Sequence, residues 1–180
     1  MKPIAGTESL HDRGAFRFRP AVIEDAMLLW EWANEFSTRQ NSFTTAEIPW
    51  REHLEWFRDK LASQNCRIWI LEWENLPVGQ IRYEGIGADT ARISFSVAAG
   101  YRGRQLGTLL LRTTSRLAAR ELGVHVVQGA TLTENLASQR AFLKAGFTLA
   151  GHKRIAQRDC MIFNLRCDDE PSRRDDSTDD

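Results

Sequence analysis

The stretch YRGRQLGTLLL, residues 101–111, joins a basic, glycine-containing segment to a leucine-rich run. The leucines from Leu106 to Leu117 recur at helical spacing, so we expect a helix to begin near Gln105. The first N–H groups of a helix lack internal partners and carry partial positive charge, which suits a phosphate. The stretch therefore predicts an anion-binding loop, although an isolated loop of this kind is more often an ordinary surface turn. The residues that favour binding are Arg102, Gly103, Arg104 and Gly107.

Two hydrophobic periods alternate along the rest of the chain. Period-two patterns or short apolar runs predict strands, and stripes at helical spacing predict helices. Asn75-Leu76-Pro77 is expected to turn one antiparallel hairpin, and Gly146 to end the last helix. The expected strands are 15–21, 66–74, 78–86, 91–99 and 125–132, and the expected helices are 24–36, 49–61, the one from about 105, and 135–145.

Composition limits the class of protein. The 180 residues suit one domain, and three cysteines without paired spacing indicate neither a disulfide framework nor a metal site. The last fourteen residues hold seven acidic side chains, leaving 22 basic and 17 acidic residues in the remainder. That modest surplus, without a basic recognition helix, argues against nucleic-acid binding. We expect loose termini at 1–14 and 167–180, a folded domain at 15–166, and a soluble cytoplasmic protein without a membrane span.

Two spaced motifs give a specific resemblance. Residues 97–107 follow the pattern V-x4-R-G-x-x-x-G, and residues 135–147 follow N-x-x-S-x-x-x-F-x-x-x-G-F. Together, in this order, they resemble the acetyl-CoA core of the GNAT superfamily of N-acetyltransferases, and the likeness spans about residues 15–165. The resemblance implies an α/β (α+β) fold, with a mostly antiparallel central sheet that is split between strands 4 and 5 and flanked by about four helices.

The same resemblance implies where acetyl-CoA, the expected cosubstrate, would lie. Backbone groups at the end of strand 4 would pair with the pantetheine arm, and the N–H groups of the glycine loop would wrap the diphosphate. A polar residue and a ring on the last helix would complete the site. The implied cosubstrate-binding residues are Val97, Ala98, Arg102, Gly103, Arg104, Gln105, Leu106, Gly107, Thr108, Asn135, Ser138 and Phe142.

The chain departs from the family pattern at two of these positions. Gln105 stands where the first glycine of the loop is usual, and backbone binding tolerates this if Gln105 adopts ordinary helical angles. Phe142 stands where many relatives carry a tyrosine that protonates the leaving thiolate. Its ring can line the pantetheine tunnel, but it cannot donate a proton.

Acetylation of an amine also needs a group that accepts the ammonium proton. Three side chains are the candidate catalytic bases: Glu84 at the end of its strand, Glu134 beside Asn135, and His53 on the second helix. Each has an ordinary alternative, because the two glutamates suit solvated strand and loop ends and His53 suits half-buried packing. Proton transfer to water is the remaining route.

An aromatic and polar cluster in residues 30–57 is the expected acceptor site. Its pattern resembles the GNAT enzymes that acetylate UDP-linked 4-amino-4,6-dideoxy sugars in pathways of the pseudaminic-acid type. Aromatic faces can stack on uracil or sugar, and Arg39 can pair with phosphate, although core packing explains the tryptophans equally well. The candidate acceptor-binding residues are Trp30, Asn34, Arg39, Ser42, His53 and Trp56.

Three functions therefore stay open at this stage. The leading one is acetyl transfer to the primary amine of a small molecule, in particular a nucleotide-linked amino sugar. The second is acetylation of a protein N-terminus or lysine. The third is a module that binds acetyl-CoA without turnover, since Phe142 replaces the usual acid. A homodimer is possible in each case.

Overall fold

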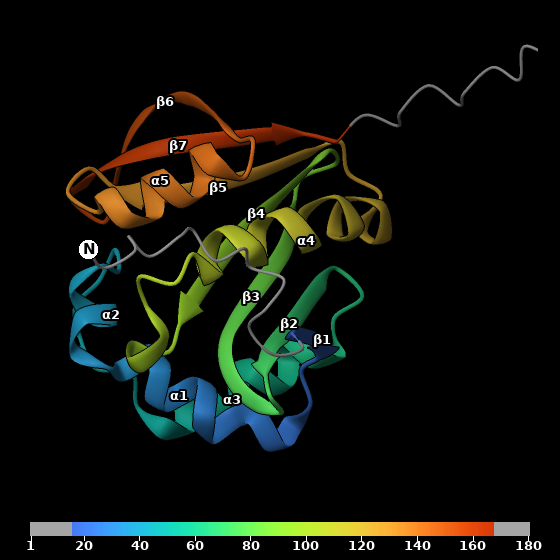
Figure 1. Cartoon of the computed structure of the whole chain (residues 1–180), viewed down its shortest axis with the longest axis vertical. Coiled ribbons are helices and arrows are strands. Elements are labelled where there is room, and N and C mark those ends of the chain that lie inside the picture. Colours follow the sequence, from blue (N-terminus) through green and yellow to red (C-terminus); the bar gives the residue numbers. More distant parts are fainter. Residues whose placement is uncertain (1–15, 168–180) are drawn as a thin grey trace, which may run out of the picture.

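The computed structural model describes residues 16–167, and the expected terminal segments lie outside these residues apart from Cys167. Seven strands and five α-helices form one layered domain (Figure 1). The strands are β1 (Phe16–Pro20), β2 (Cys66–Trp73), β3 (Leu76–Ile86), β4 (Thr90–Val97), β5 (Val126–Leu132), β6 (Thr148–Ile155) and β7 (Arg158–Arg166). The α-helices are α1 (Ala26–Asn34), α2 (Phe36–Gln40), α3 (Trp50–Ala62), α4 (Leu106–Leu122) and α5 (Leu136–Lys144), with short 3-10 turns η2 (Ile23–Asp25) and η3 (Ala99–Tyr101).

The sheet has the order β1-β2-β3-β4-β5-β7-β6, and every pair is antiparallel except β4 with β5. That parallel pair joins only three positions, the last being Arg92 opposite Gln128. Beyond it, β4 continues to pair with β3 up to Val97, and β5 continues to pair with β7 up to Leu132. The two halves of the sheet therefore diverge between β4 and β5, which confirms the predicted GNAT-type fold and its split.

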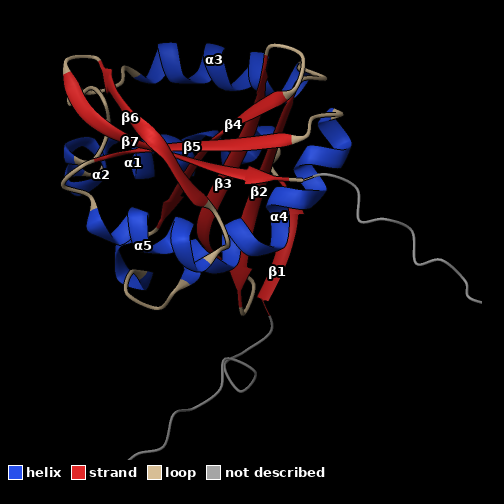
Figure 2. Ribbon diagram, turned by 90° about the horizontal axis from the view of Figure 1, so that it is seen from above, coloured by secondary structure: helices blue, strands red, loops and turns tan. Residues whose placement is uncertain are grey.

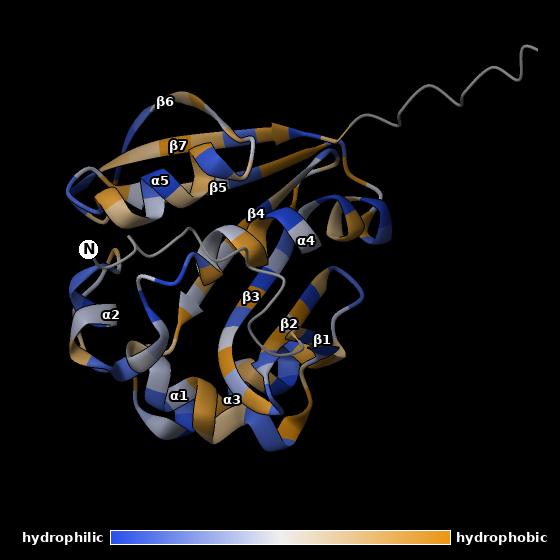
Figure 3. Ribbon diagram, in the orientation of Figure 1, coloured by the Kyte–Doolittle hydropathy of each residue, from blue (hydrophilic) through white to orange (hydrophobic). Residues whose placement is uncertain are grey.

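Helices cover both faces of the sheet, and Figure 2 shows α3 on one face and α4 with α5 on the other. Alternate residues of a strand point to opposite faces. On β3, Ile81 and Tyr83 join the larger core under α4, whereas the α3 face of β2 packs Ile68 and Ile70 against α1 and α3. Figure 3 shows the matching mixture of hydrophobic and hydrophilic residues along α4. Among the described helices, none is long and apolar enough to cross a membrane.

Two tight turns set the strand registers. The β2–β3 turn is made by Glu74 and Asn75, both with positive φ, so it begins one residue earlier than predicted, and Leu76 and Pro77 belong to β3. Ala156 and Gln157 make the same kind of turn between β6 and β7. Two consecutive residues at positive φ match the twist of antiparallel strands, which explains why each hairpin closes in two residues.

The first predicted helix, 24–36, is divided in the structure. Glu35 has an extended ψ of 134°, which ends α1 and begins α2. Its carboxylate accepts hydrogen bonds from the N–H groups of Ser37 and Thr38, so it acts as the N-cap of α2. The hydrophobic period did not reveal this break, because a cap of this kind leaves the spacing of apolar residues unchanged.

Phe142 of α5 lies in the core and is 2 % exposed. Its ring stacks on Phe163 of β7 at 5.2 Å between centroids and meets Phe95 of β4 edge-on at 5.6 Å. A Cβ built on Gly129 of β5 would lie 2.2 Å from Cζ of Phe142, so the ring occupies the space that only a glycine leaves. The ring therefore packs against Gly129 of β5, between Phe95 of β4 and Phe163 of β7, and its place in a pantetheine tunnel stays a prediction.

We expect Gly129→Ala to lower the free energy of unfolding by about 1–3 kcal/mol, because the new methyl group would clash with the Phe142 ring. Phe142→Ala alone should cost about 3–5 kcal/mol through cavity formation, and the double variant should cost less than the sum. Denaturant unfolding of the four proteins measures the coupling. Gly100→Ala, where a Cβ would meet nothing within 4 Å, is the control. Strict additivity would contradict the packing described.

Candidate active site

The loop before α4 has an unusual backbone. Gln105 is the N-cap of α4 and has φ 62° and ψ 14°, the left-handed conformation, and Gly103 has φ 77°. The expectation of ordinary helical angles at Gln105 is therefore wrong, because the chain keeps the sharp bend that the usual glycine would make. A non-glycine residue in this conformation costs roughly 1–2 kcal/mol. The backbone strain therefore lies at the N-terminus of α4.

The first turn of α4 has free donors. The N–H groups of residues 105–108 make no hydrogen bond within the part of the chain that the structure describes, and no side chain caps this helix. Leu106 and Thr108 bury their side chains, so only their backbone faces the loop. Gly107 has a packing reason as well, since a Cβ there would lie 3.0 Å from the Phe95 ring. Four convergent donors at a helix N-terminus suit a phosphate group.

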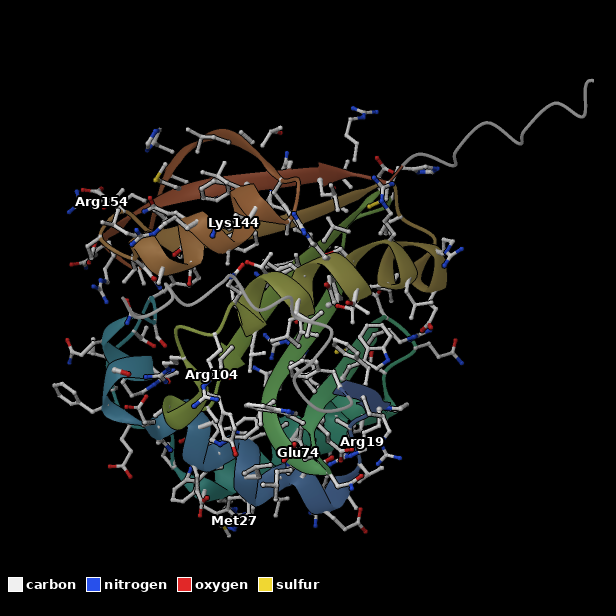
Figure 4. The ribbon with its side chains drawn as sticks, in the orientation of Figure 1. Arg19, Met27, Glu74, Arg104, Lys144 and Arg154 are labelled. Atoms are coloured by element: carbon white, nitrogen blue, oxygen red, sulfur yellow. The ribbon has the colours of Figure 1, made fainter. Side chains whose placement is uncertain are left out.

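The two arginines of the loop have different surroundings. Arg102 donates to the carbonyl of Val97 at 3.0 Å and pairs with Glu35 at 2.6 Å, and it also binds the hydroxyls of Ser37 and Thr38. Its guanidinium thus fixes α2 to the end of β4 and is not free for a phosphate. Arg104, labelled in Figure 4, lies over the rings of Trp73 and Tyr101 and has no ion pair within residues 16–167.

The pairing of Arg102 with Glu35 is electrostatically strong. The hydrogen bond from Arg102 is the largest influence on the carboxyl, and it lowers the pKa of Glu35 from 4.5 to about 2. The hydroxyl and N–H donors at the start of α2 act in the same direction. The Glu35 carboxylate therefore stays ionised, and the ion pair is kept, until the pH falls toward 2.

The end of β4 offers less backbone than the resemblance implies. The N–H of Ala98 donates to the carbonyl of Val78 at 2.9 Å, and the carbonyl of Ala98 accepts from Tyr101 at 2.9 Å. Both groups of Ala98 are therefore engaged, and the carbonyl of Val97 is engaged by Arg102. Of these two residues, the N–H of Val97 is the group that stays a candidate donor.

Polar groups on β5 and α5 fit the expected cosubstrate. Asn135 caps α5 by accepting from the N–H of Ser138 at 3.1 Å, which leaves its amide N–H₂ without a partner among the described residues. Thr131 lies on β5 beyond the last pair with β4, and its hydroxyl is buried without a partner there. The sequence analysis missed Thr131, because a single strand threonine carries no pattern. Together with the free N–H groups at α4, these donors and acceptors fit acetyl-CoA.

The three candidate bases do not meet at the split. Glu84 is aligned with Arg92, roughly 17 Å along β4 from Val97 at the usual strand rise, and is bound by Lys60 at 2.6 Å. His53 is 4 % exposed, with Nε2 donating to the carbonyl of Ala26 at 3.1 Å, and burial lowers its pKa. These two therefore have structural roles. Residues 16–167 contain no group of three His, Cys, Asp or Glu side chains placed to hold a metal ion.

Glu134 lies nearest the wide end of the split but is exposed. It lies two residues after the end of β5, and its carboxylate accepts from Arg158 at 2.6 Å. A backbone hydrogen bond and this arginine lower its pKa. A carboxylate whose pKa is lowered is ionised but weakly basic, so pairing with Arg158 makes Glu134 a poor proton acceptor.

Most polar groups of the predicted acceptor cluster form hydrogen bonds within residues 30–48. Trp30 Nε1 and Asn34 Nδ2 both donate to the carbonyl of Ile48, at 2.7 and 2.9 Å, and Asn34 Oδ1 accepts from the N–H of Ile48. The Ser42 hydroxyl donates to the carbonyl of Thr38. Trp56 packs beside His53 on α3 and lies under the guanidinium of Arg82. These residues shape the site, but their polar groups are mostly satisfied.

Arg39 is the exception in this cluster. It donates to the Ser42 hydroxyl at 2.8 Å and to the carbonyl of Ala46 at 3.2 Å, but no carboxylate within residues 16–167 pairs with it, and its buried Nε has no partner there. Burial lowers its pKa. A half-buried guanidinium without an acid is a candidate partner for an anion.

Arg158 joins this region to the C-terminal half of the sheet. From the start of β7 it donates to the carbonyls of Gln40 and Ser42 at 2.8 and 2.7 Å, and to Glu134. In Figure 1, α2 lies on the side where the two halves of the sheet diverge. Arg158 therefore connects β7 and Glu134, after β5, to the C-terminal end of α2.

Comparison with known proteins identifies the class. A model of the acetyltransferase (GNAT) domain matches residues 16–148, which is most of the chain. The chain therefore belongs to the GNAT acetyltransferase family, and it is an acetyl-CoA-dependent N-acetyltransferase. Comparison with curated protein sequences gives no match.

Solved structures share the fold. The aminoglycoside acetyltransferase AAC(6')-Ib in complex with ribostamycin and coenzyme A has a TM-score of 0.73 at 21 % identity, over 84 % of this chain and 93 % of that chain. The spermidine N-acetyltransferase from Vibrio cholerae in complex with CoA and spermine has a TM-score of 0.75 at 14 % identity, over 84 % and 95 % of the two chains. At these sequence identities, the similarity shows a shared fold.

We expect Arg104→Gln to weaken coenzyme A binding about tenfold, since a charge-assisted contact to phosphate is lost, and to reduce its salt dependence. Arg102→Gln should instead lower the melting temperature, because it releases α2 from the loop. Arg116→Gln, an exposed arginine on α4, is the control. Calorimetric titration at two ionic strengths, with melting curves, separates the effects. Equal behaviour of the Arg102 and Arg104 variants would contradict this division.

The lowered pKa of Glu35 gives a pH dependence. A carboxyl with a depressed folded-state pKa stabilises the protein above its unfolded value of 4.5, and that contribution is lost as pH falls toward 2. The melting temperature of Glu35→Gln should therefore lie below that of the wild type at pH 7, and the difference should shrink between pH 4.5 and about 2. Glu55→Gln, in an exposed pair with Arg51, is the control. A difference independent of pH would argue against the ion pair.

Proposed function

We propose that this N-acetyltransferase acts on the primary amine of a small molecule, and that the acceptor is a nucleotide-linked amino sugar. The divided sheet with free donors at α4 is the observation that supports acetyl transfer, because it provides a place for acetyl-CoA between β4 and β5. Arg39, a half-buried guanidinium without an acid partner among the described residues, is the observation that supports a phosphate-bearing acceptor.

Acetyl-CoA supplies an activated acetyl thioester. The amine nitrogen attacks the thioester carbonyl, the C–N bond forms, the C–S bond breaks, and coenzyme A leaves as the thiol or thiolate. The N–H of Val97 at the edge of the split is our candidate for stabilising the oxyanion. Because Phe142 is buried and cannot donate a proton, no side chain at that position assists the leaving thiolate.

None of the three candidate bases, all within the described residues, is well suited to accept the proton of the acceptor ammonium. Glu84 and His53 are engaged elsewhere, and Glu134 is bound by Arg158. We infer that the amine binds in its neutral form and that its proton passes to solvent. The rate should therefore rise with pH toward the pKa of the acceptor amine itself. The homodimer and the cytoplasmic location expected from the sequence stay predictions.

The acceptor class is tested through Arg39. Truncation of a charge-assisted contact to phosphate costs about 1.5–3 kcal/mol, so Arg39→Ala should raise the acceptor KM by roughly one to two orders of magnitude and leave acetyl-CoA affinity unchanged. Free-thiol release with a UDP-linked amino sugar measures this, and UDP should compete with the acceptor. Arg39→Lys keeps the charge but loses the bidentate guanidinium. Melting curves of both variants show whether the contacts of Arg39 with Ser42 and Ala46 also stabilise the fold. Acetylation of peptide amines together with indifference to UDP would overturn the proposal in favour of a protein substrate.

A further inference from the structure

The α3 side of β3 and β4 carries a row of polar side chains between the helices and the split. We call Gln80, Arg82, Ser94 and Ser96 the polar sheet face. Gln80 stands opposite Ser96, and Arg82 stands opposite Ser94. Gln80 Nε2 donates to the Ser96 hydroxyl at 3.2 Å. Alternation along the strands directs all four side chains to one side, opposite to the core under α4.

This face is open over β4. Ser94 is exposed and Ser96 is half-exposed. Of the described helices, α3 packs mainly on β2, and α4 packs on the opposite side of β3 and β4. A bound molecule can therefore contact β4 from the α3 side and approach Val97 along the strand. The donor loop at α4 lies at the other side of the sheet, so this face is free to receive the acceptor.

Arg82 is the charged residue of this face, and its guanidinium lacks a hydrogen-bonding partner among the described residues. Its Nε is buried without a hydrogen bond, and no ion pair or hydrogen bond reaches its guanidinium within the described chain. The nearest acid along the strand, Glu84, is held by Lys60 at 2.6 Å and by Arg92 at 3.8 Å. Burial lowers the pKa of Arg82, and the nearby Glu84 carboxylate offsets only part of this effect.

The guanidinium is nevertheless held in place. Its Cζ lies 4.8 Å from the centroid of the Trp56 ring, so one face of the guanidinium is covered by an aromatic surface. A stacked guanidinium keeps the donors along its edge available, which is the arrangement that binds carboxylate or phosphate in a bidentate manner. A half-buried cation with a buried, unbonded Nε is costly for stability, and replacing such a charge by an apolar residue of similar size is often neutral or favourable. Folding alone therefore does not explain Arg82.

We propose that Arg82 binds an oxyanion, a carboxylate or a phosphate, of the acceptor and thereby selects amines that carry a negative group. Arg82 faces Ser94, three residues before Val97, so the anion would lie roughly 10 Å along β4 from the reacting amine. The exposed Ser94 hydroxyl is placed to donate a second hydrogen bond. An uncompensated guanidinium at this position also disfavours polycationic acceptors.

This inference rests on the proposed function, and the experiment separates the two. Free-thiol release from acetyl-CoA is compared for hexylamine and 6-aminohexanoate, which differ in a terminal carboxylate, and for glucosamine and glucosamine 6-phosphate. Wild-type protein is expected to prefer the anionic member by at least tenfold in kcat/KM. The pair that shows the preference tells carboxylate from phosphate.

The variants assign the preference to one residue. Arg82→Met is expected to abolish it while leaving the KM for acetyl-CoA and the melting temperature unchanged, or to raise the melting temperature. Arg82→Lys should keep part of it. Arg92→Met, an exposed arginine on the same side of β4, is the matched control and should keep all of it. A wild type that acetylates both members equally, or an Arg82→Met protein that keeps the preference, would overturn the inference and leave acetyl transfer intact.

A direct binding measurement covers the remaining case. Calorimetric titration of 6-aminohexanoate and glucosamine 6-phosphate into the protein with coenzyme A should give weaker binding to Arg82→Met than to the wild type. If acetyl-CoA binds but none of these amines is acetylated, the proposed function fails for these acceptors. The titration then decides the inference by itself: loss of anion binding in Arg82→Met supports it, and unchanged or absent anion binding overturns it.

Discussion

Everything in this site depends on the point at which β4 and β5 stop pairing. Their backbones share only three positions, and each strand continues with its outer neighbour alone. An unpaired strand edge costs free energy unless other groups satisfy it, so the divergence needs support. Phe95, Phe142 and Phe163 supply that support on the α5 side by filling the space that opens, and Gly129 leaves room for them. The remaining backbone of the split is then available to a ligand.

The sheet separates two kinds of chemistry by strand alternation alone. On β3 and β4 the residues that face α4 are apolar, and the helix they support presents free N–H groups to an anion. The intervening residues from Gln80 to Glu84 and from Arg92 to Ser96 are polar and face the α3 side, where the guanidinium of Arg82 has no hydrogen-bonded acid among the described residues. A diphosphate and an acceptor can thus approach the same edge of β4 from opposite sides without competing for side chains.

The sequence predicts the fold better than the site. The motifs in residues 97–107 and 135–147 reflect backbone geometry. Their residue spacing can therefore be recognised without knowing which side chains contact one another. Side-chain partners carry no such pattern, so the bond of Arg102 to Glu35 was not foreseeable, and packing of His53 was one of two interpretations that the sequence left open. Gln105 shows a second limit, because it adopts a glycine-like conformation that its identity does not suggest. The strands after Gly146 were missed as well, since the exposed β6 lacks a clear alternation. Arg82 escaped notice because one arginine in a strand is usually a solvated charge.

The contact of Arg158 with the carbonyls of Gln40 and Ser42 has a consequence for the order of assembly during synthesis. The two partners are separated by more than a hundred residues, so this contact forms after nearly the whole domain has left the ribosome. Helices α1 and α3 with β2 and β3 can collapse earlier, because their contacts are closer in the chain. The segment around Ser42 therefore receives its final partner last, and a chain truncated before β7 would present an unfinished acceptor side to the cell's chaperones and proteases.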